Sequence, residues 1–174
     1  MLPVLKQYFH LSTLELAIGL TLINLGFPLG SFLQSFSDNY GRSPFVFLDT
    51  VIIIAFGLLS VISWSFYSFV VFRFFYEIGI GFCLPLTSSI MSEISPAKER
   101  GPFLAKLWII WVCGYFASCL LGYLILTHNN WRLMLLILCL PSVLSLFIHC
   151  CWGRETVHYL WAKKEVKSVH LLVN

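Results

Sequence analysis

Residues 38–42, Asp-Asn-Tyr-Gly-Arg, form a short polar island between two long apolar runs, and residues 93–101, Glu-Ile-Ser-Pro-Ala-Lys-Glu-Arg-Gly, form a second island. Charged loops that join uninterrupted apolar runs of bilayer-spanning length are typical of integral membrane proteins. The pattern therefore predicts a multi-pass membrane protein in which each island connects two membrane helices.

The composition supports this class. The 174 residues are 59% hydrophobic and only 11% charged, whereas a soluble domain carries roughly a quarter charged residues. The net charge of +3 is too small and too dispersed to indicate a nucleic-acid partner. The six cysteines form no CxxC pair and lie in or at the ends of apolar runs, so we interpret them as packing residues and expect no metal site or cofactor.

The apolar runs predict an all-α bundle of about five transmembrane helices, each near the roughly 20 residues that cross a bilayer. Barrel strands would alternate apolar and polar residues, and these runs do not. The expected spans are residues 14–36, 45–64, 66–91, 104–127 and 133–152, between an N-terminal tail of residues 1–13 and a C-terminal tail of residues 153–174.

The distribution of basic residues predicts the orientation. In alternate loops, eight Lys and Arg residues fall on one side and two, Lys6 and Arg132, on the other. The basic side is expected to face the cytoplasm. The N-terminus is then extracytoplasmic and the C-terminus cytoplasmic, in a membrane that the sequence does not identify.

The islands suit the ends of neighbouring helices. Gly41 permits a tight turn, and Pro96 stops one span before Gly101 opens the next. Glu93 and Arg100 would then lie close enough for a salt bridge. The alternative is that both islands are solvated loops whose charges only follow the inside rule.

Two charges lie within the third span. Arg73 is about two helical turns inside it, and Glu77 follows at i+4, a spacing at which the two side chains can meet. A charge inside a membrane marks a functional site by default, but a structural ion pair explains the same pattern. Glu77 is expected to be the only buried acid.

Five motifs occur in the order and spacing of major facilitator superfamily transporters. They are DNYGR at 38–42, Arg73 with the glycines at 79 and 81, EISP…ERG at 93–101, Trp131-Arg132, and ETVHYL at 155–160. The chain most resembles the branch that holds sugar porters, organic-ion transporters and synaptic-vesicle-glycoprotein-2-related proteins.

This resemblance implies that the spans are helices two to six of a twelve-helix fold, an incomplete N-terminal half. It also implies a cytoplasmic latch that biases the outward-open state. The matching latch residues are Asp38, Gly41, Arg42, Glu93, Glu99, Arg100 and Gly101. The chain departs from the family pattern at Gln34, Asn39 and Ser43, and Glu77 replaces a glycine. Trp108 stands where sugar porters carry a sugar-binding Gln, which argues against a hexose.

Several side chains are candidates for a central substrate cavity, although aromatic residues in membrane helices more often pack or face lipid. These candidates are Asn24, Tyr76, Thr87, Trp108 and Trp111. Small residues at fourfold spacing predict close helix packing at two places: Gly26 with Gly30, and Gly114 with Ser118 and Gly122.

We expect a partial N-terminal half of a secondary transporter that moves a small organic solute across a lipid bilayer, completed by a C-terminal half or a partner chain. The alternative is a non-transporting membrane scaffold or subunit that needs a partner. No HExxH motif, paired intramembrane aspartates or nucleophile–base pair indicates an enzyme.

Overall fold

The computed structural model describes the chain except for residues 1, 38–41, 97, 127–129 and 153–174. Within the described residues all regular structure is helical, as expected. The elements are α1 (Leu2–Tyr8), α2 (Thr13–Asn24), α3 (Gly26–Leu33), the 3₁₀ turn η1 (Gln34–Phe36), α5 (Ser43–Ile62), α6 (Phe66–Ile94), α7 (Arg100–Leu126) and α8 (Trp131–Trp152).

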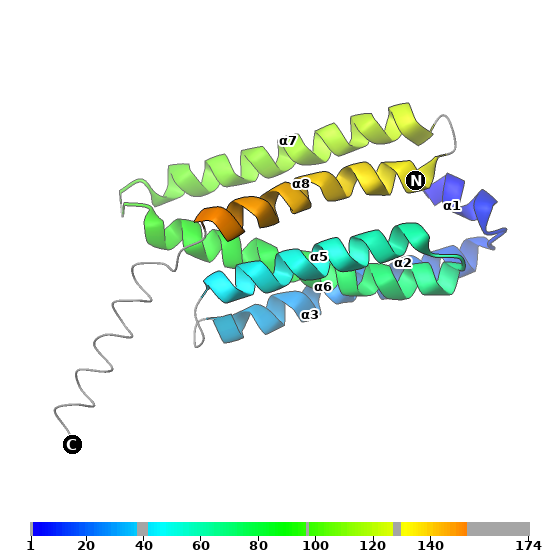
Figure 1. The fold of residues 1–174 in the computed structure, drawn as a ribbon, viewed down its shortest axis with the longest axis horizontal. Helices are drawn as coiled ribbons and strands as arrows, with labels where there is room; N and C mark the ends of the chain where they lie inside the picture. The colour runs from blue at the N-terminus through cyan, green and yellow to red at the C-terminus, as the bar shows by residue number, and fades with distance from the viewer. Residues whose placement is uncertain (1, 38–41, 97, 127–129, 153–174) are drawn as a thin grey trace, which may run out of the picture.

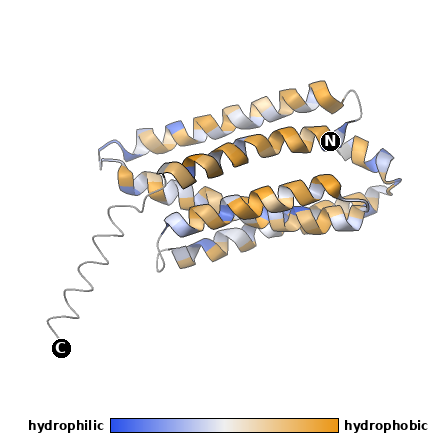
Figure 2. Ribbon diagram, in the orientation of Figure 1, coloured by the Kyte–Doolittle hydropathy of each residue, from blue (hydrophilic) through white to orange (hydrophobic). Residues whose placement is uncertain are grey.

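Among the described residues, five helical segments are long and apolar enough to cross a membrane, and the first of them is formed jointly by α2, α3 and η1. They lie side by side along one axis (Figure 1), and hydrophobic residues cover most of their length (Figure 2). The chain is therefore a multi-pass membrane protein. We call the end where α5 begins and α6 ends the Arg42 end, and the opposite end, where α8 begins, the Trp131 end.

The N-terminal residues are folded, although the sequence suggested a tail. Leu5 of α1 is 2% exposed and belongs to an apolar cluster with Phe66 and Trp131 at the Trp131 end. Ser12 then starts α2 through a capping box with Glu15, which satisfies backbone N–H groups at the helix start. Apolar side chains of α1 thus fold over this end of the bundle.

Glycines bring α3 and α6 into backbone contact. A Cβ atom on Gly30 would overlap the Ile78 carbonyl oxygen of α6, and one on Gly81 would overlap the Phe27 carbonyl oxygen of α3. Gly26 meets the α6 backbone in the same way. The predicted Gly26–Gly30 packing ridge is confirmed, and it places α6 at the centre of the bundle between α2, α3 and α5.

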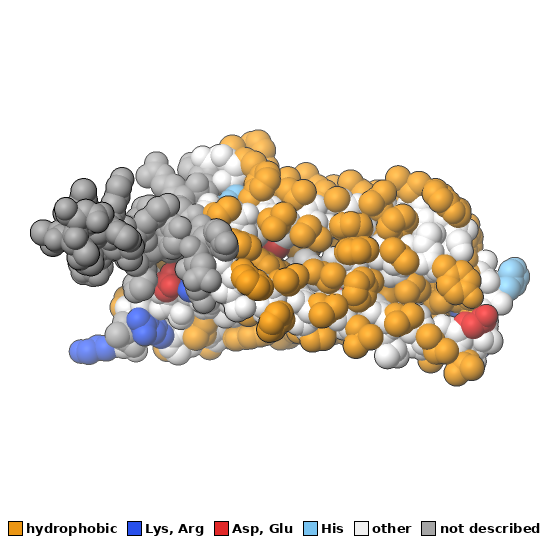
Figure 3. Space-filling view, turned by 90° about the horizontal axis from the view of Figure 1, so that it is seen from below, with side chains coloured by type: hydrophobic (Ala, Val, Ile, Leu, Met, Phe, Trp, Pro, Cys, Tyr) orange, Lys and Arg blue, Asp and Glu red, His pale blue; other side chains and the backbone are white. Residues whose placement is uncertain are grey.

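Helix α7 lies at the edge, and of its residues only Gly122 is buried. Gly122 faces Met134 of α8, but a Cβ on Gly114 would meet no atom within 4 Å, so the second predicted ridge is wrong at Gly114. An apolar groove of about 680 Å³ opens between α7 and α8. The space-filling view shows apolar side chains along the bundle and charged side chains gathered mainly at its ends (Figure 3).

The glycine contact generates a stability prediction. Gly81→Ala places a methyl group against the Phe27 carbonyl oxygen, and overpacking of this kind costs about 1–3 kcal/mol. We expect a lower thermal midpoint in lipid nanodiscs. Gly114→Ala, which adds the same methyl group in open space, should leave the midpoint unchanged. Equal midpoints for the two variants would contradict the α3–α6 contact.

Candidate functional site

A salt bridge joins two helices at the Arg42 end. Arg42 is the N-cap residue of α5, and Glu93 lies in the last turn of α6. Arg42 Nη2 is 2.8 Å from Glu93 Oε1, and the two side chains are 11% and 20% exposed. Each charge has the unfavourable sign for its own helix end, because helix N-termini carry partial positive charge and C-termini partial negative charge. The pair therefore stabilises the contact between α5 and α6 rather than either helix alone.

The partner of Glu93 differs from the one that the sequence suggested. Within the described residues no ion pair joins Glu93 to Arg100, so the expected Glu93–Arg100 bridge is wrong. The reason is that α5 packs directly on α6, whereas α7 begins only after the turn at Pro96. Three residues of the expected latch are exposed where α7 starts: Glu99, Arg100 and Gly101. Two others lie outside the described residues: Asp38 and Gly41.

Arg73 is paired with aromatic rings. Its guanidinium carbon lies 4.7 Å from the ring centre of Tyr76 and 5.7 Å from that of Phe69, contacts that stabilise a cation away from water. No salt bridge joins Arg73 to Glu77 in the described part of the chain, so that expected ion pair is wrong. Glu77 instead packs toward α3, where its Cβ lies against Gly26.

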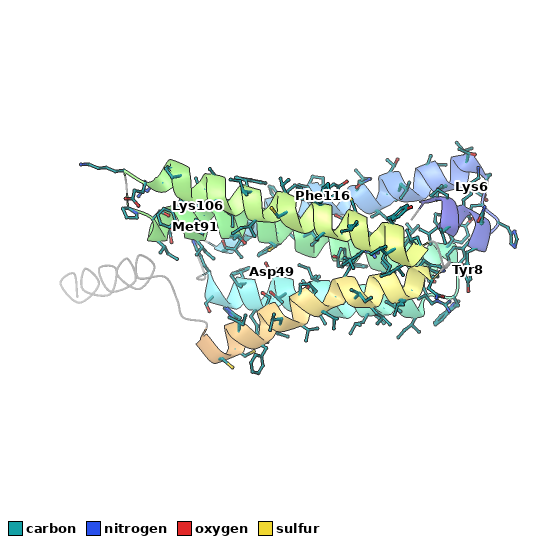
Figure 4. The ribbon with its side chains drawn as sticks, turned by 90° about the horizontal axis from the view of Figure 1, so that it is seen from above. Lys6, Tyr8, Asp49, Met91, Lys106 and Phe116 are labelled. Atoms are coloured by element: carbon teal, nitrogen blue, oxygen red, sulfur yellow. The ribbon has the colours of Figure 1, made fainter. Side chains whose placement is uncertain are left out.

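Asp49 is an acidic residue of the membrane interior that sequence reasoning missed. Its side chain is 2% exposed, whereas Glu77 is only partly buried, so the expectation that Glu77 is the only buried acid is wrong. Asp49 projects from α5 toward the side where α6 and α7 lie (Figure 4). Thr50 Oγ1 is 3.0 Å from its Oδ1, and the Cys83 thiol of α6 lies beside it. An acid inside an apolar run is the sequence signal that could have found it.

Three of the expected cavity residues come together between α6 and α7. Thr87, Trp108 and Trp111 line a pocket of about 220 Å³. The ring centres of Trp108 and Trp111 are 6.1 Å apart in an edge-on arrangement. The remaining lining residues are Cys83, Leu84, Ser88, Leu107 and Ile110. None of these described lining residues is charged, so the pocket offers aromatic faces and a few hydroxyl groups.

The other two expected cavity residues lie elsewhere. Asn24 is exposed, and its side-chain amide donates to the Leu20 carbonyl of its own helix, 2.9 Å away. Tyr76 lies near Gly57 of α5 and under the Arg73 guanidinium. Neither residue lines the α6–α7 pocket.

Comparison with known proteins identifies relatives over nearly the whole chain. Residues 1–173 match the family model of the Major Facilitator Superfamily. The chain is 28% identical to the niacin transporter NiaP of Acinetobacter baylyi, over 86% of this chain and 34% of that protein. It is 24% identical to synaptic vesicle glycoprotein 2A of Rattus norvegicus, over 72% of this chain and 19% of that protein.

A solved structure shares the fold. The proton:xylose symporter XylE bound to 6-bromo-6-deoxy-D-glucose superimposes with a TM-score of 0.80 at 19% identity, over 93% of this chain and 41% of that one. The chain thus spans about a third of the length of NiaP and less than half of XylE.

The salt bridge predicts strong coupling between its partners. Glu93→Gln or Arg42→Gln should each destabilise the protein by roughly 1–3 kcal/mol, because each removes one charge of a partly buried ion pair that joins α5 to α6. The double variant Arg42→Gln/Glu93→Gln should be at least as stable as the less stable of the two single variants. Thermal midpoints in nanodiscs measure this. The control cycle combines Arg42→Gln with Glu99→Gln, and its effects should add; additive effects in the first cycle would contradict the bridge.

Proposed function

Because the chain belongs to the major facilitator superfamily, we propose that it forms part of a secondary transporter that moves a small organic solute by alternating access. The observation that carries this proposal is the Arg42–Glu93 salt bridge, because both residues are among those that the family resemblance assigns to a latch, in a chain of which residues 1–173 match the family model. The rest of the transporter would come from further polypeptide or from a partner chain.

The salt bridge would act as the latch at the cytoplasmic side. The excess of Lys and Arg in the loops at the Arg42 end supports a cytoplasmic location for this end. Both charges oppose their own helix dipoles, so separating α5 from α6 would leave each one destabilised. The bridge would therefore hold the cytoplasmic side closed until binding energy elsewhere opens it.

The α6–α7 pocket would contact the solute. Its indole rings favour a planar ring system, and its hydroxyl groups can bond a small polar substituent. Because the described lining carries no charge, an uncharged planar solute fits it better than an anion or a sugar. Nicotinamide, the uncharged amide of the niacin that names the relative NiaP, is therefore the first probe to try, and niacin itself, an anion near neutral pH, is the charged comparison.

Solute exchange tests the transport proposal. The full-length natural protein in proteoliposomes should exchange radiolabelled nicotinamide across the membrane faster than protein-free liposomes. Trp108→Ala or Trp111→Ala should weaken apparent affinity roughly 2- to 10-fold, since an aromatic contact contributes about 0.5–1.5 kcal/mol. Trp64→Ala, at an exposed residue between α5 and α6, is the matched control. No exchange of either probe or of xylose would favour the non-transporting alternative.

Opening of the latch should be visible at Cys83. In a variant that keeps Cys83 as its one cysteine, Glu93→Gln should increase labelling by an impermeant maleimide from the Arg42 side several-fold, because the bridge no longer opposes opening. Glu99→Gln, a loss of the same charge at an exposed residue, should leave the rate unchanged. Equal rates in the two variants would exclude a latch at Glu93.

A further inference from the structure

The Asp49 carboxyl group is buried inside the bundle, about 9 Å along α5 from its start at Ser43 by the rise of 1.5 Å per residue. A carboxylate held there without a cation is strongly disfavoured. We propose that Asp49 is a proton-binding site of the membrane interior, protonated in the packed arrangement of α5 and α6 and connected to the α6–α7 pocket through Cys83 and Thr87.

The hydroxyl group of Thr50 gives geometric support for a proton on Asp49. Thr50 Oγ1 lies 2.7 Å from the Val46 carbonyl oxygen and 3.0 Å from Asp49 Oδ1. A hydroxyl group has one hydrogen but can also accept, so it cannot donate fully to both oxygens. If Asp49 is protonated, its O–H donates to Thr50, and Thr50 donates to Val46. This arrangement satisfies both short contacts, and an ionised Asp49 leaves one of them without a hydrogen.

The described surroundings of Asp49 supply no counter-charge. No salt bridge in the described part of the chain reaches it, and Arg73 is stacked on an aromatic ring farther toward the Trp131 end. The described residues of helices α6 and α8 place five ionisable groups against α5. Cys83 lies beside Asp49, and Tyr76 and Cys139 lie around Gly57. His149 lies next to Ser43, and Glu93 pairs with Arg42. A proton is therefore the species that neutralises Asp49.

A short series of polar groups leads from Asp49 to the pocket. Cys83 lies beside Asp49 on the α6 side, and its sulfur is 3.7 Å from Thr87 Oγ1. Both Cys83 and Thr87 line the α6–α7 pocket. Water in the pocket would thus be separated from the Asp49 carboxyl group only by the Cys83 side chain. In the present arrangement, the packing of α5 against α6 keeps this water from reaching the carboxyl group.

The proton step is simple. When α5 and α6 separate and water from the pocket reaches Asp49, the Oδ–H bond breaks, the proton passes to water, and the carboxylate is solvated. Return of a proton from water restores the neutral acid and allows α5 and α6 to close. Linking this step to solute movement rests on the proposed transport function, but proton binding by Asp49 does not.

Infrared difference spectroscopy of the full-length protein in nanodiscs tests proton binding directly. Raising the pH should remove a carboxylic C=O band in the wild type. Asp49→Asn should lack this titrating band. Glu77→Gln, which removes an acid in the middle of the neighbouring helix α6, should retain it. Absence of a titrating band, or its loss in Glu77→Gln instead, would overturn the proposal.

A second pair of variants covers the case in which Asp49→Asn does not fold. Thr50→Val removes the hydroxyl group next to the carboxyl and should shift the frequency of the C=O band. Thr21→Val removes a hydroxyl group that bonds only the Ala17 carbonyl of its own helix and should leave the band unchanged. Identical bands in wild type and Thr50→Val would contradict the assignment to Asp49.

Transport assays separate this proposal from the proposed function. Nicotinamide carries no titrating charge near neutral pH, so a pH gradient acts on it only through the protein. Asp49→Asn should keep nicotinamide exchange without a gradient and lose the extra accumulation that a pH gradient drives in the wild type. If the wild type exchanges no solute, the transport proposal fails while the infrared result stands; gradient-driven accumulation by Asp49→Asn would overturn the coupling.

Discussion

The close approach of α3 and α6 is the constraint on which the rest of the bundle depends. Glycines on both helices let backbone touch backbone, and packing without side chains between helices is one of the few ways to gain contact energy where lipid offers no hydrophobic driving force. The contact fixes α6 in the centre, and α2, α3, α5 and α7 all pack on it. A side chain on α6 therefore has a defined position relative to every neighbouring span.

The functional groups are arranged along α6 at successive depths. Arg73 with its aromatic rings lies toward the Trp131 end, Cys83 and Thr87 lie between the ends, and Glu93 lies at the Arg42 end. The neighbours differ from level to level, although α5 is present at each: α5 and α8 lie near Arg73, α5 and α7 lie near Cys83, and the start of α5 lies at Glu93. A small shift of α6 along or about its axis would change all three contacts together, which gives this helix the geometry of a coupling element.

Sequence reasoning predicted the fold but only part of the site. The long apolar runs predict the helices, and the spacing of Gly26 and Gly30 predicts one packing face. Both signals can be recognised within a single stretch of sequence. The Arg42–Glu93 pair and the aromatic partners of Arg73 depend on which helices are neighbours and how each is rotated, and no local pattern contains that information. Asp49 belongs to none of the matched motifs, although a lone acid in an apolar run is a signal that the sequence itself contains.

The described residues form the proposed gating groups more fully than they form the solute pocket. The groups proposed to set its conformational and protonation state, Arg42 with Glu93 and Asp49 with Thr50, contact each other within the described residues of α5 and α6. The solute pocket is different, because α7 leaves Trp108 and Trp111 about half exposed and α6 forms only one wall. Solute selection would therefore depend also on whatever packs against the open face of α7, whereas the gating chemistry would not. Substitutions at Arg42, Glu93 or Asp49, which lie outside the pocket lining, should consequently alter coupling for every solute alike, and substitutions at Trp108 or Trp111 of α7 should alter the choice among solutes.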